Sequence, residues 1–144
     1  MFDSILVVCV GNICRSPIGE RLLKKLMPEK RVASAGVAAL VGKPADEMSA
    51  LVAKENGLSL DGHIANQLNR KKCLEYDLIL VMEPKHLETV CNIAPEVRGK
   101  VMLFGHWNNQ EPIGDPYRKS KEVFEYVYSQ LNSSALAWAD KLNR

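Results

Sequence analysis

The sequence predicts an α/β domain of three layers, with helices on both faces of a central four-stranded parallel sheet. Short, continuous apolar runs, which are typical of strands buried on both faces, alternate along the chain with segments of helical period. The length of 144 residues suits a single domain over residues 1–144, and no repeat or linker composition divides it. In such folds ligands bind beyond the carboxyl ends of the strands, so we expect the functional residues there.

The elements are predicted in alternating order. Four apolar runs are the predicted strands: residues 5–10, 31–35, 78–82 and 101–104. The first helix is predicted over residues 18–27, with Ser16 as its N-cap and Pro17 in its first turn. The last helix, residues 120–142, carries an apolar stripe with the helical period throughout.

Two shorter helices are predicted between these. Asp46 is the expected N-cap of the second helix, and Gly57 is expected to close it. Pro84 leads into the third helix, residues 85–91. Both segments lie between predicted strands, as the alternating pattern requires.

Composition excludes several classes of function. Apolar residues make up 47% of the chain and charged residues 25%, the balance of an ordinary globular domain. The net charge of +2 is too small to indicate nucleic acid or a membrane surface as partner. The apolar runs are far shorter than the roughly 20 residues of a membrane-spanning helix, so no membrane insertion is expected. Four cysteines without framework spacing fit a reducing compartment, and the sequence therefore predicts a cytoplasmic protein.

The loop between the first strand and the first helix carries the chemistry. Its residues are Cys9, Val10, Gly11, Asn12, Ile13, Cys14, Arg15 and Ser16. Backbone N–H groups of such a loop, together with a helix N-terminus, favour a bound dianion. Arg15 adds a planar fork that matches phosphate oxygens, and these positive surroundings favour the thiolate of Cys9. Gly11 is expected to supply the unusual backbone conformation and close approach that wrapping an anion requires.

The stretch Cys-Val-Gly-Asn-Ile-Cys-Arg-Ser-Pro, residues 9–17, resembles the phosphate loop of the low-molecular-weight protein tyrosine phosphatases. Asp115-Pro116-Tyr117 resembles that family's general-acid loop, and residues 99–107 resemble its bacterial members associated with exopolysaccharide or capsule production. The similarity extends over essentially the whole chain. It implies the family's phosphotyrosine phosphatase I-like fold with flavodoxin-like winding, and hydrolysis of phosphotyrosine through a cysteinyl-phosphate intermediate.

The resemblance implies a role for each main site residue. Cys9 is the implied nucleophile, Arg15 the phosphate clamp, and Asp115 the acid that protonates the leaving phenolate and later accepts a proton from water. Tyr117 and Leu40 are the implied walls of the substrate entrance. A deep slot of this kind selects phosphotyrosine by reach, because phosphoserine is too short to arrive at the floor.

Three other residues refine this interpretation. Ile13 suits phosphotyrosine, since relatives that act on phosphoarginine carry threonine at this position. Arg118 stands where mammalian-type relatives carry a second tyrosine, which favours the bacterial branch. Glu111 is the nearest rival to Asp115 as the general acid, and we expect it not to fill that role.

The resemblance also implies a supporting network. Asn12 and Ser16 match residues that form hydrogen bonds within the family's phosphate loop, and Ser34 and His63 match their partners. Ser16 is further expected to bond the Cys9 thiolate and ease its departure. Cys14 is implied to form a transient disulfide that protects Cys9, with a simple packing role as the open alternative.

Two alternative functions remain at this stage. An arsenate reductase of the same fold needs a further redox cysteine pair, but Cys73 and Cys91 lie further apart than that relay usually allows. A cysteine phosphocarrier or anion-binding module would gain nothing from a general acid such as Asp115.

No cofactor or metal is predicted, because the chain lacks nucleotide-binding glycine patterns and paired zinc-ligand spacing. The partner implied by resemblance is a phosphotyrosine protein, namely the tail of a tyrosine autokinase. The oligomeric state has no signal in the sequence.

Overall fold

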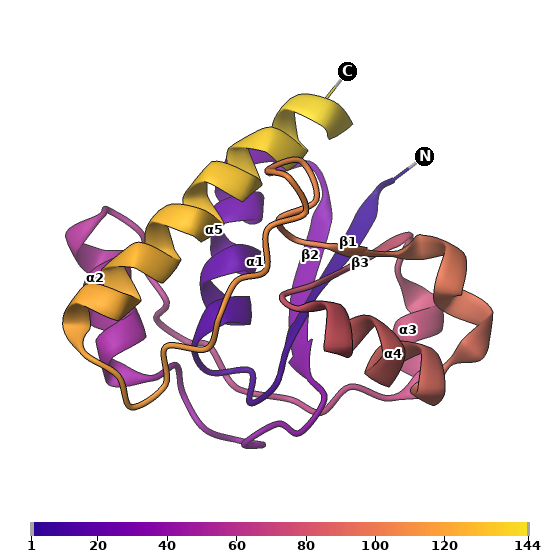
Figure 1. The fold of residues 1–144 in the computed structure, drawn as a ribbon, viewed down its shortest axis with the longest axis horizontal. Coiled ribbons are helices and arrows are strands. Elements are labelled where there is room, and N and C mark those ends of the chain that lie inside the picture. The colour runs from indigo at the N-terminus through magenta and orange to yellow at the C-terminus, as the bar shows by residue number, and fades with distance from the viewer. Residues whose placement is uncertain (1, 144) are drawn as a thin grey trace.

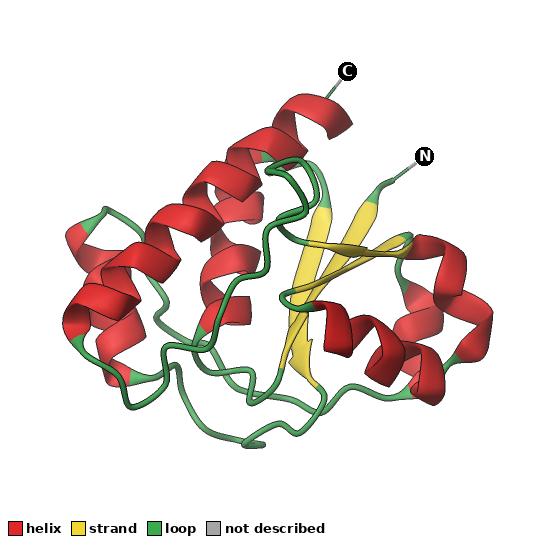
Figure 2. Ribbon diagram, viewed as in Figure 1, coloured by secondary structure: helices red, strands yellow, loops and turns green. Residues whose placement is uncertain are grey.

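The computed structural model describes residues 2–143. Four strands form one sheet in the order β2-β1-β3-β4 (Figures 1 and 2). The strands are β1 (Ser4–Cys9), β2 (Arg31–Gly36), β3 (Leu78–Val81) and β4 (Val101–Leu103). All neighbouring strands pair in parallel. The predicted four-stranded parallel sheet is confirmed, and the strand ends differ from the expected bounds by one residue.

Helices cover both faces of the sheet, which confirms the three layers. The helices are α1 (Arg15–Leu26), α2 (Glu47–Glu55), α3 (Arg70–Glu75), α4 (Pro84–Ile93) and α5 (Lys121–Leu142), with a 3₁₀ turn η1 (Pro95–Lys100) before β4. Figure 1 shows α1, α2 and α5 on one face and α3 and α4 on the other. No helix within residues 2–143 is long and apolar enough to cross a membrane.

The central strand β1 is apolar from Ile5 to Cys9, because both of its faces are covered. Ile5 and Val7 pack into the core beneath α1 and α5, whereas Leu6 and Val8 pack into the core beneath α3 and α4. Alternate side chains of a strand point to opposite faces, so a strand covered on both faces buries every residue.

The topology places the loop after β1 at a crevice. The chain leaves β1 through α1 to β2 on one side, and β3 pairs with β1 on the other side. This is the expected flavodoxin-like winding, in which the crevice outside the first strand is the usual binding position. Cys9 is the last residue of β1 and therefore lies at that crevice.

The prediction that Ser16 caps the first helix is wrong. Helix α1 begins at Arg15, its N-cap position is Cys14, and no side chain caps it. The Ser16 hydroxyl is instead hydrogen-bonded to the side chains of Cys9 and Asn12. By contrast, the predicted cap of α2 is confirmed, since the Asp46 carboxylate accepts from Met48 N and Ser49 N.

Two short elements were not predicted, α3 and η1. Each has only six residues, and α3 is mostly polar, so neither produces a periodic apolar pattern of useful length. Helix α3 contributes to the site through Lys72, whose Nζ donates a hydrogen bond to Asn66 Oδ1.

Candidate active site

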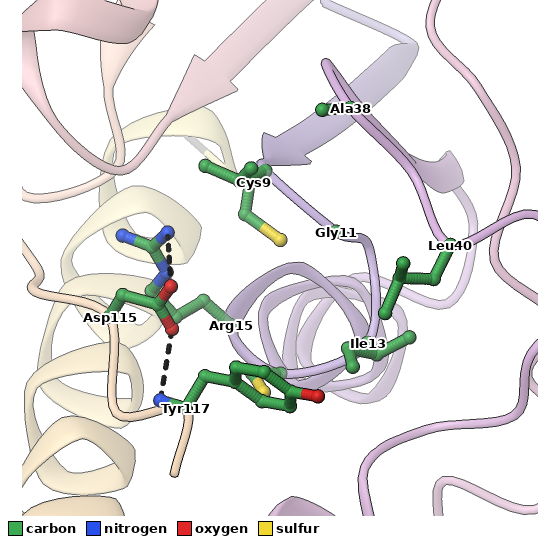
Figure 3. A pocket seen from close by; sticks show the side chains of 10 residues that line it. Cys9, Gly11, Ile13, Arg15, Ala38, Leu40, Asp115 and Tyr117 are labelled. Carbon is green, nitrogen blue, oxygen red and sulfur yellow. Dashed lines mark hydrogen bonds and ion pairs between the residues drawn. The ribbon is translucent and has the colours of Figure 1, made fainter. Parts of the chain in front are cut away.

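A pocket of about 170 Å³ opens beyond the carboxyl end of β1 (Figure 3). Its lining residues are Cys9, Val10, Gly11, Ile13, Cys14, Arg15, Ala38, Leu40, Asp115 and Tyr117. All of these except Ala38 were expected at the site from the sequence. The fold therefore brings together the loop after β1, the segment after β2 and the loop before α5.

Cys9 lies at the floor of the pocket. The residue is only 2% exposed, and Figure 3 shows its sulfur turned toward the pocket. Cys9 Sγ lies 2.9 Å from Ser16 Oγ. Ser16 Oγ already accepts from Asn12 Nδ2 at 2.7 Å, so its single hydrogen is free to be donated to the sulfur. The Ser16 hydroxyl is therefore placed to donate a hydrogen bond to the sulfur.

Arg15 presents one edge of its guanidinium to the pocket. The side chain is 1% exposed, and Nη1 donates to Glu83 Oε1 at 2.7 Å and to Ile113 O at 2.8 Å. Nη2 lies 3.9 Å from Asp115 Oδ2, and Nε has no hydrogen-bond partner among the described residues. The Nε–Nη2 edge is thus the one available for bidentate binding of an oxyanion.

Glu83, which was not identified from the sequence, forms an ion pair with Arg15 Nη1. Partial burial works to raise the pKa of Glu83, but the hydrogen bond and charge of Arg15 outweigh it and keep that pKa below its ordinary value. The carboxylate is therefore ionised and paired with Arg15 at neutral pH. Its signal in the sequence was weak but present, because Glu83 follows β3 at the same edge of the sheet as Cys9.

His86 lies behind this ion pair. The residue is 3% exposed, its Nε2 is 4.0 Å from Glu83 Oε1, and neither ring nitrogen has a hydrogen-bond partner among the described residues. Burial lowers the pKa of His86, and the charge of Arg15 lowers it further, so the imidazole is neutral near pH 7. A neutral ring leaves Glu83 to pair with Arg15.

Asp115 reaches the pocket from the loop before α5. Its Oδ1 accepts from Tyr117 N at 3.0 Å, while Oδ2 faces Arg15 (Figure 3). The side chain is 48% exposed, so it can exchange protons with water. Glu111 does not line the pocket and instead accepts a hydrogen bond from Gln130 Nε2 at 2.7 Å. The geometry thus favours Asp115 over its rival.

The expected supporting network is present around Asn12. This residue is fully buried, and its Nδ2 donates to Ser16 Oγ and to Ser34 Oγ at 3.0 Å. Its Oδ1 accepts from Asn66 N at 3.0 Å, and its backbone carbonyl accepts from His63 Nε2 at 2.6 Å. Every polar atom of the Asn12 side chain is satisfied, which rigidifies the loop that surrounds the pocket floor.

Three residues at the ends of this network, Glu20, Lys24 and Lys72, were not identified from the sequence. Ser34 Oγ donates to Glu20 Oε1 at 2.7 Å, and Glu20 is itself paired with Lys24. At the other end, Lys72 Nζ donates to Asn66 Oδ1 at 2.5 Å. These partners come from α1 and α3, so only the tertiary fold brings them to the loop.

Gly11 does not carry the left-handed backbone conformation of the loop. Gly11 is not among the residues with positive φ, and a Cβ added to it would meet nothing closer than 3.7 Å. The left-handed conformation falls instead on Asn12, whose φ is 58°. The close approach falls on Gly36 of β2, where a Cβ would lie 2.3 Å from Val10 O. Hydrogen bonds hold Asn12 in its strained conformation, and only glycine fits at Gly36.

None of the four cysteines is in a disulfide bond. Burial first, and then the charge of Asp46, raise the pKa of Cys14 to about 12, so it is a neutral thiol. A disulfide between Cys9 and Cys14 stays a prediction. Cys73 and Cys91 lie buried in α3 and α4 and do not line the pocket. Within residues 2–143, no group of three or more His, Cys, Asp and Glu side chains is arranged to hold a metal ion.

Comparison with known proteins gives a consistent set of matches. A family model described as "Low molecular weight phosphotyrosine protein phosphatase" matches residues 4–144. The chain is 58% identical over 144 residues to the probable low molecular weight protein-tyrosine-phosphatase AmsI of Erwinia amylovora, covering 100% of both chains. It is 60% identical over 143 residues to the low molecular weight protein-tyrosine-phosphatase Wzb of Escherichia coli K12, covering 99% of this chain and 97% of that one. The solved structure of Vibrio vulnificus Wzb in complex with benzylphosphonate is 56% identical, with a TM-score of 0.96 and coverage of 98% and 99%.

Proposed function

The chain belongs to the low molecular weight phosphotyrosine protein phosphatase family, and from that premise we propose that Cys9, Arg15 and Asp115 carry out its phosphatase reaction. Cys9 is the nucleophile, Arg15 the phosphate clamp, and Asp115 the general acid and base. The observation that supports this proposal is the convergence of the Cys9 sulfur, the Nε–Nη2 edge of Arg15 and the Asp115 carboxyl group on one pocket.

In the first step the Cys9 thiolate attacks the phosphorus atom of phosphotyrosine in line with the leaving phenolate. A sulfur–phosphorus bond forms as the phosphorus–oxygen bond to the ring breaks, and Asp115 transfers its proton to the phenolate oxygen. Arg15 binds two non-bridging oxygens through Nε and Nη2, and the loop N–H groups bind the remaining charge. The phenol leaves, and Cys9 carries the phosphoryl group.

In the second step water hydrolyses the phosphocysteine. The Asp115 carboxylate accepts a proton from the attacking water, a new phosphorus–oxygen bond forms, and the sulfur–phosphorus bond breaks. The departing Cys9 thiolate is stabilised by the Ser16 hydroxyl, whose hydrogen Asn12 leaves free. Inorganic phosphate is released, and Asp115 is again protonated for the next cycle.

The walls of the pocket support an aromatic substrate. Leu40 and Tyr117 both line the pocket and are 45% and 39% exposed, so they form a partly open, apolar entrance above the sulfur. A phosphotyrosine ring fits between such walls, and Tyr117 offers an aromatic face to stack against it. Vibrio vulnificus Wzb, which is similar over nearly its whole length, binds benzylphosphonate, an aromatic phosphonate.

The natural substrate that we propose is the phosphorylated tail of a tyrosine autokinase that controls exopolysaccharide export, in the cytoplasm. The resemblance of residues 9–17 and 99–107 to the exopolysaccharide-associated members supports this choice. An Asp115→Ala variant, incubated with cell lysate, should retain this phosphoprotein for identification. Recovery of only serine- or threonine-phosphorylated proteins would contradict the proposed substrate class.

The catalytic proposal is tested by rapid mixing with p-nitrophenyl phosphate. The unaltered protein should release a burst of p-nitrophenol and yield a trapped phosphocysteine at Cys9. Cys9→Ser should abolish turnover and still bind phosphate, whereas Cys91→Ser, a buried cysteine outside the pocket, serves as the matched control. Normal turnover by Cys9→Ser would overturn the assignment.

A further inference from the structure

The turn that follows Asp115 carries an arginine in an unfavourable backbone conformation. Lys119 N donates to Pro116 O at 2.9 Å, which closes a four-residue turn with Tyr117 and Arg118 at its centre. The φ of Arg118 is 63°. A positive φ at the third residue is the requirement of a type II turn, and glycine is the residue that meets it without strain.

The side chain of Arg118 gains a specific position from this turn. Its guanidinium carbon lies 5.2 Å from the centroid of the Tyr117 ring, within the range of a cation–π contact. Tyr117 in turn lines the pocket. The turn therefore holds the positive charge of Arg118 against the ring of Tyr117.

No carboxylate within residues 2–143 forms an ion pair with the Arg118 guanidinium. None of the ion pairs between described residues includes Arg118, and the neighbouring Asp115 carboxyl group is directed to Tyr117 N and Arg15. Arg118 occupies a backbone position that favours glycine, and its side chain is exposed and lies against Tyr117. It is therefore placed to contact a ligand that extends over the rim of the pocket entrance.

A peptide substrate must cross that rim. When the phosphotyrosine ring occupies the pocket against Tyr117, the peptide residues next to it extend over the entrance, within reach of Arg118. The arginine fork matches a carboxylate in a bidentate geometry. We propose that Arg118 is a specificity-determining residue that selects phosphotyrosine sites with an aspartate or glutamate beside the phosphotyrosine. This inference rests on the proposed function, since it requires phosphotyrosine in the pocket.

The test compares three phosphotyrosine peptides that differ only in the residues flanking the phosphotyrosine, which are glutamate, alanine or lysine. Each kcat/KM is divided by the value for p-nitrophenyl phosphate with the same variant. The unaltered protein should prefer the glutamate peptide over the alanine peptide by about fivefold, mainly through KM. Arg118→Gln should bring that ratio close to one. The preference should also weaken in high salt, because the pair is exposed.

Two further variants make the result specific. Arg118→Gly should lose the same preference while its melting temperature stays equal or rises, because glycine relieves the positive φ. Lys119→Gln removes the next exposed cation of the turn and should keep the preference. The inference is overturned if the unaltered protein shows no preference, if Arg118→Gln keeps it, or if Lys119→Gln loses it equally. Failure of the underlying function would look different, since p-nitrophenyl phosphate would then not be hydrolysed at all.

Discussion

Arg15 Nη1 and Glu83 Oε1 lie 2.7 Å apart, in an ion pair between the first turn of α1 and the residue that precedes α4. This contact occupies one terminal nitrogen of the guanidinium and turns the opposite edge, Nε and Nη2, toward the pocket. The orientation of the Arg15 guanidinium is thus decided by a residue that does not line the pocket itself.

Glu83→Ala should weaken binding of the phosphoryl group. Without Glu83, only Ile113 O still accepts from Arg15 Nη1 and the guanidinium is held less firmly, so we expect kcat/KM for p-nitrophenyl phosphate to fall by about 10–100-fold. Inhibition by inorganic phosphate should weaken in parallel. Glu88→Ala, at an exposed carboxylate in α4, is the control, and equal phosphate affinity in Glu83→Ala and the unaltered protein would contradict the prediction.

Gly36→Ala should disrupt the phosphate loop. The new Cβ would lie 2.3 Å from Val10 O and 3.0 Å from Asn12 N, and backbone atoms cannot yield as a flexible side chain does. We expect a loss of stability of about 1–3 kcal/mol and a larger proportional loss of activity. Thermal denaturation and turnover measure the two effects. Gly99→Ala is the control, because a Cβ there meets nothing within 4 Å.

Asp115→Ala should affect poor leaving groups more than good ones. Protonating a phenolate of high basicity is worth about 10²–10⁴-fold in rate, whereas p-nitrophenolate leaves without much assistance. The measurement is kcat/KM across a series of substituted aryl phosphates, because this ratio reports the steps up to release of the phenol, and its dependence on leaving-group pKa should steepen. Glu111→Gln should leave that dependence as it is, and an unchanged slope in Asp115→Ala would assign the acid to another group.

His86 should make the protein sensitive to acid. Burial lowers its pKa in the folded state, so the unfolded chain binds a proton more readily, and stability falls as pH drops below the ordinary value of 6.5. His86→Leu removes the group that titrates, together with two ring nitrogens that have no hydrogen-bond partner among the described residues. Its melting temperature should change less between pH 7.5 and pH 5 than that of the unaltered protein. An equal or greater loss for His86→Leu would refute the assignment.

Most of the fold was predictable because its signals are local. Residues 5–9 of β1 and residues 78–81 of β3 are all apolar, since both faces of each strand are covered. The cap of α2 by Asp46 follows from one side chain and two nearby N–H groups. Helix α3 was missed because six mostly polar residues carry no period, and its position depends on packing against the sheet.

The site divides in the same way. Cys9, Arg15 and Ser16 share one short segment, so their types and spacing already indicate an anion-binding loop with a nucleophile. The direction of the hydrogen bond to the sulfur is a different matter. It depends on Asn12 and on Asn66, which lies 54 residues further along the chain.

By itself, the sequence determined the strand and helix pattern, the phosphate loop and the candidate general acid, because these depend on neighbouring residues and on motifs of fixed spacing. Only the tertiary structure decided which edge of Arg15 faces the pocket and that Gly36 must lack a side chain. The physical reason is that pairing, burial and close backbone approach join residues far apart in the chain. Such contacts exist only once the strands have found their register and the loops have packed at their ends.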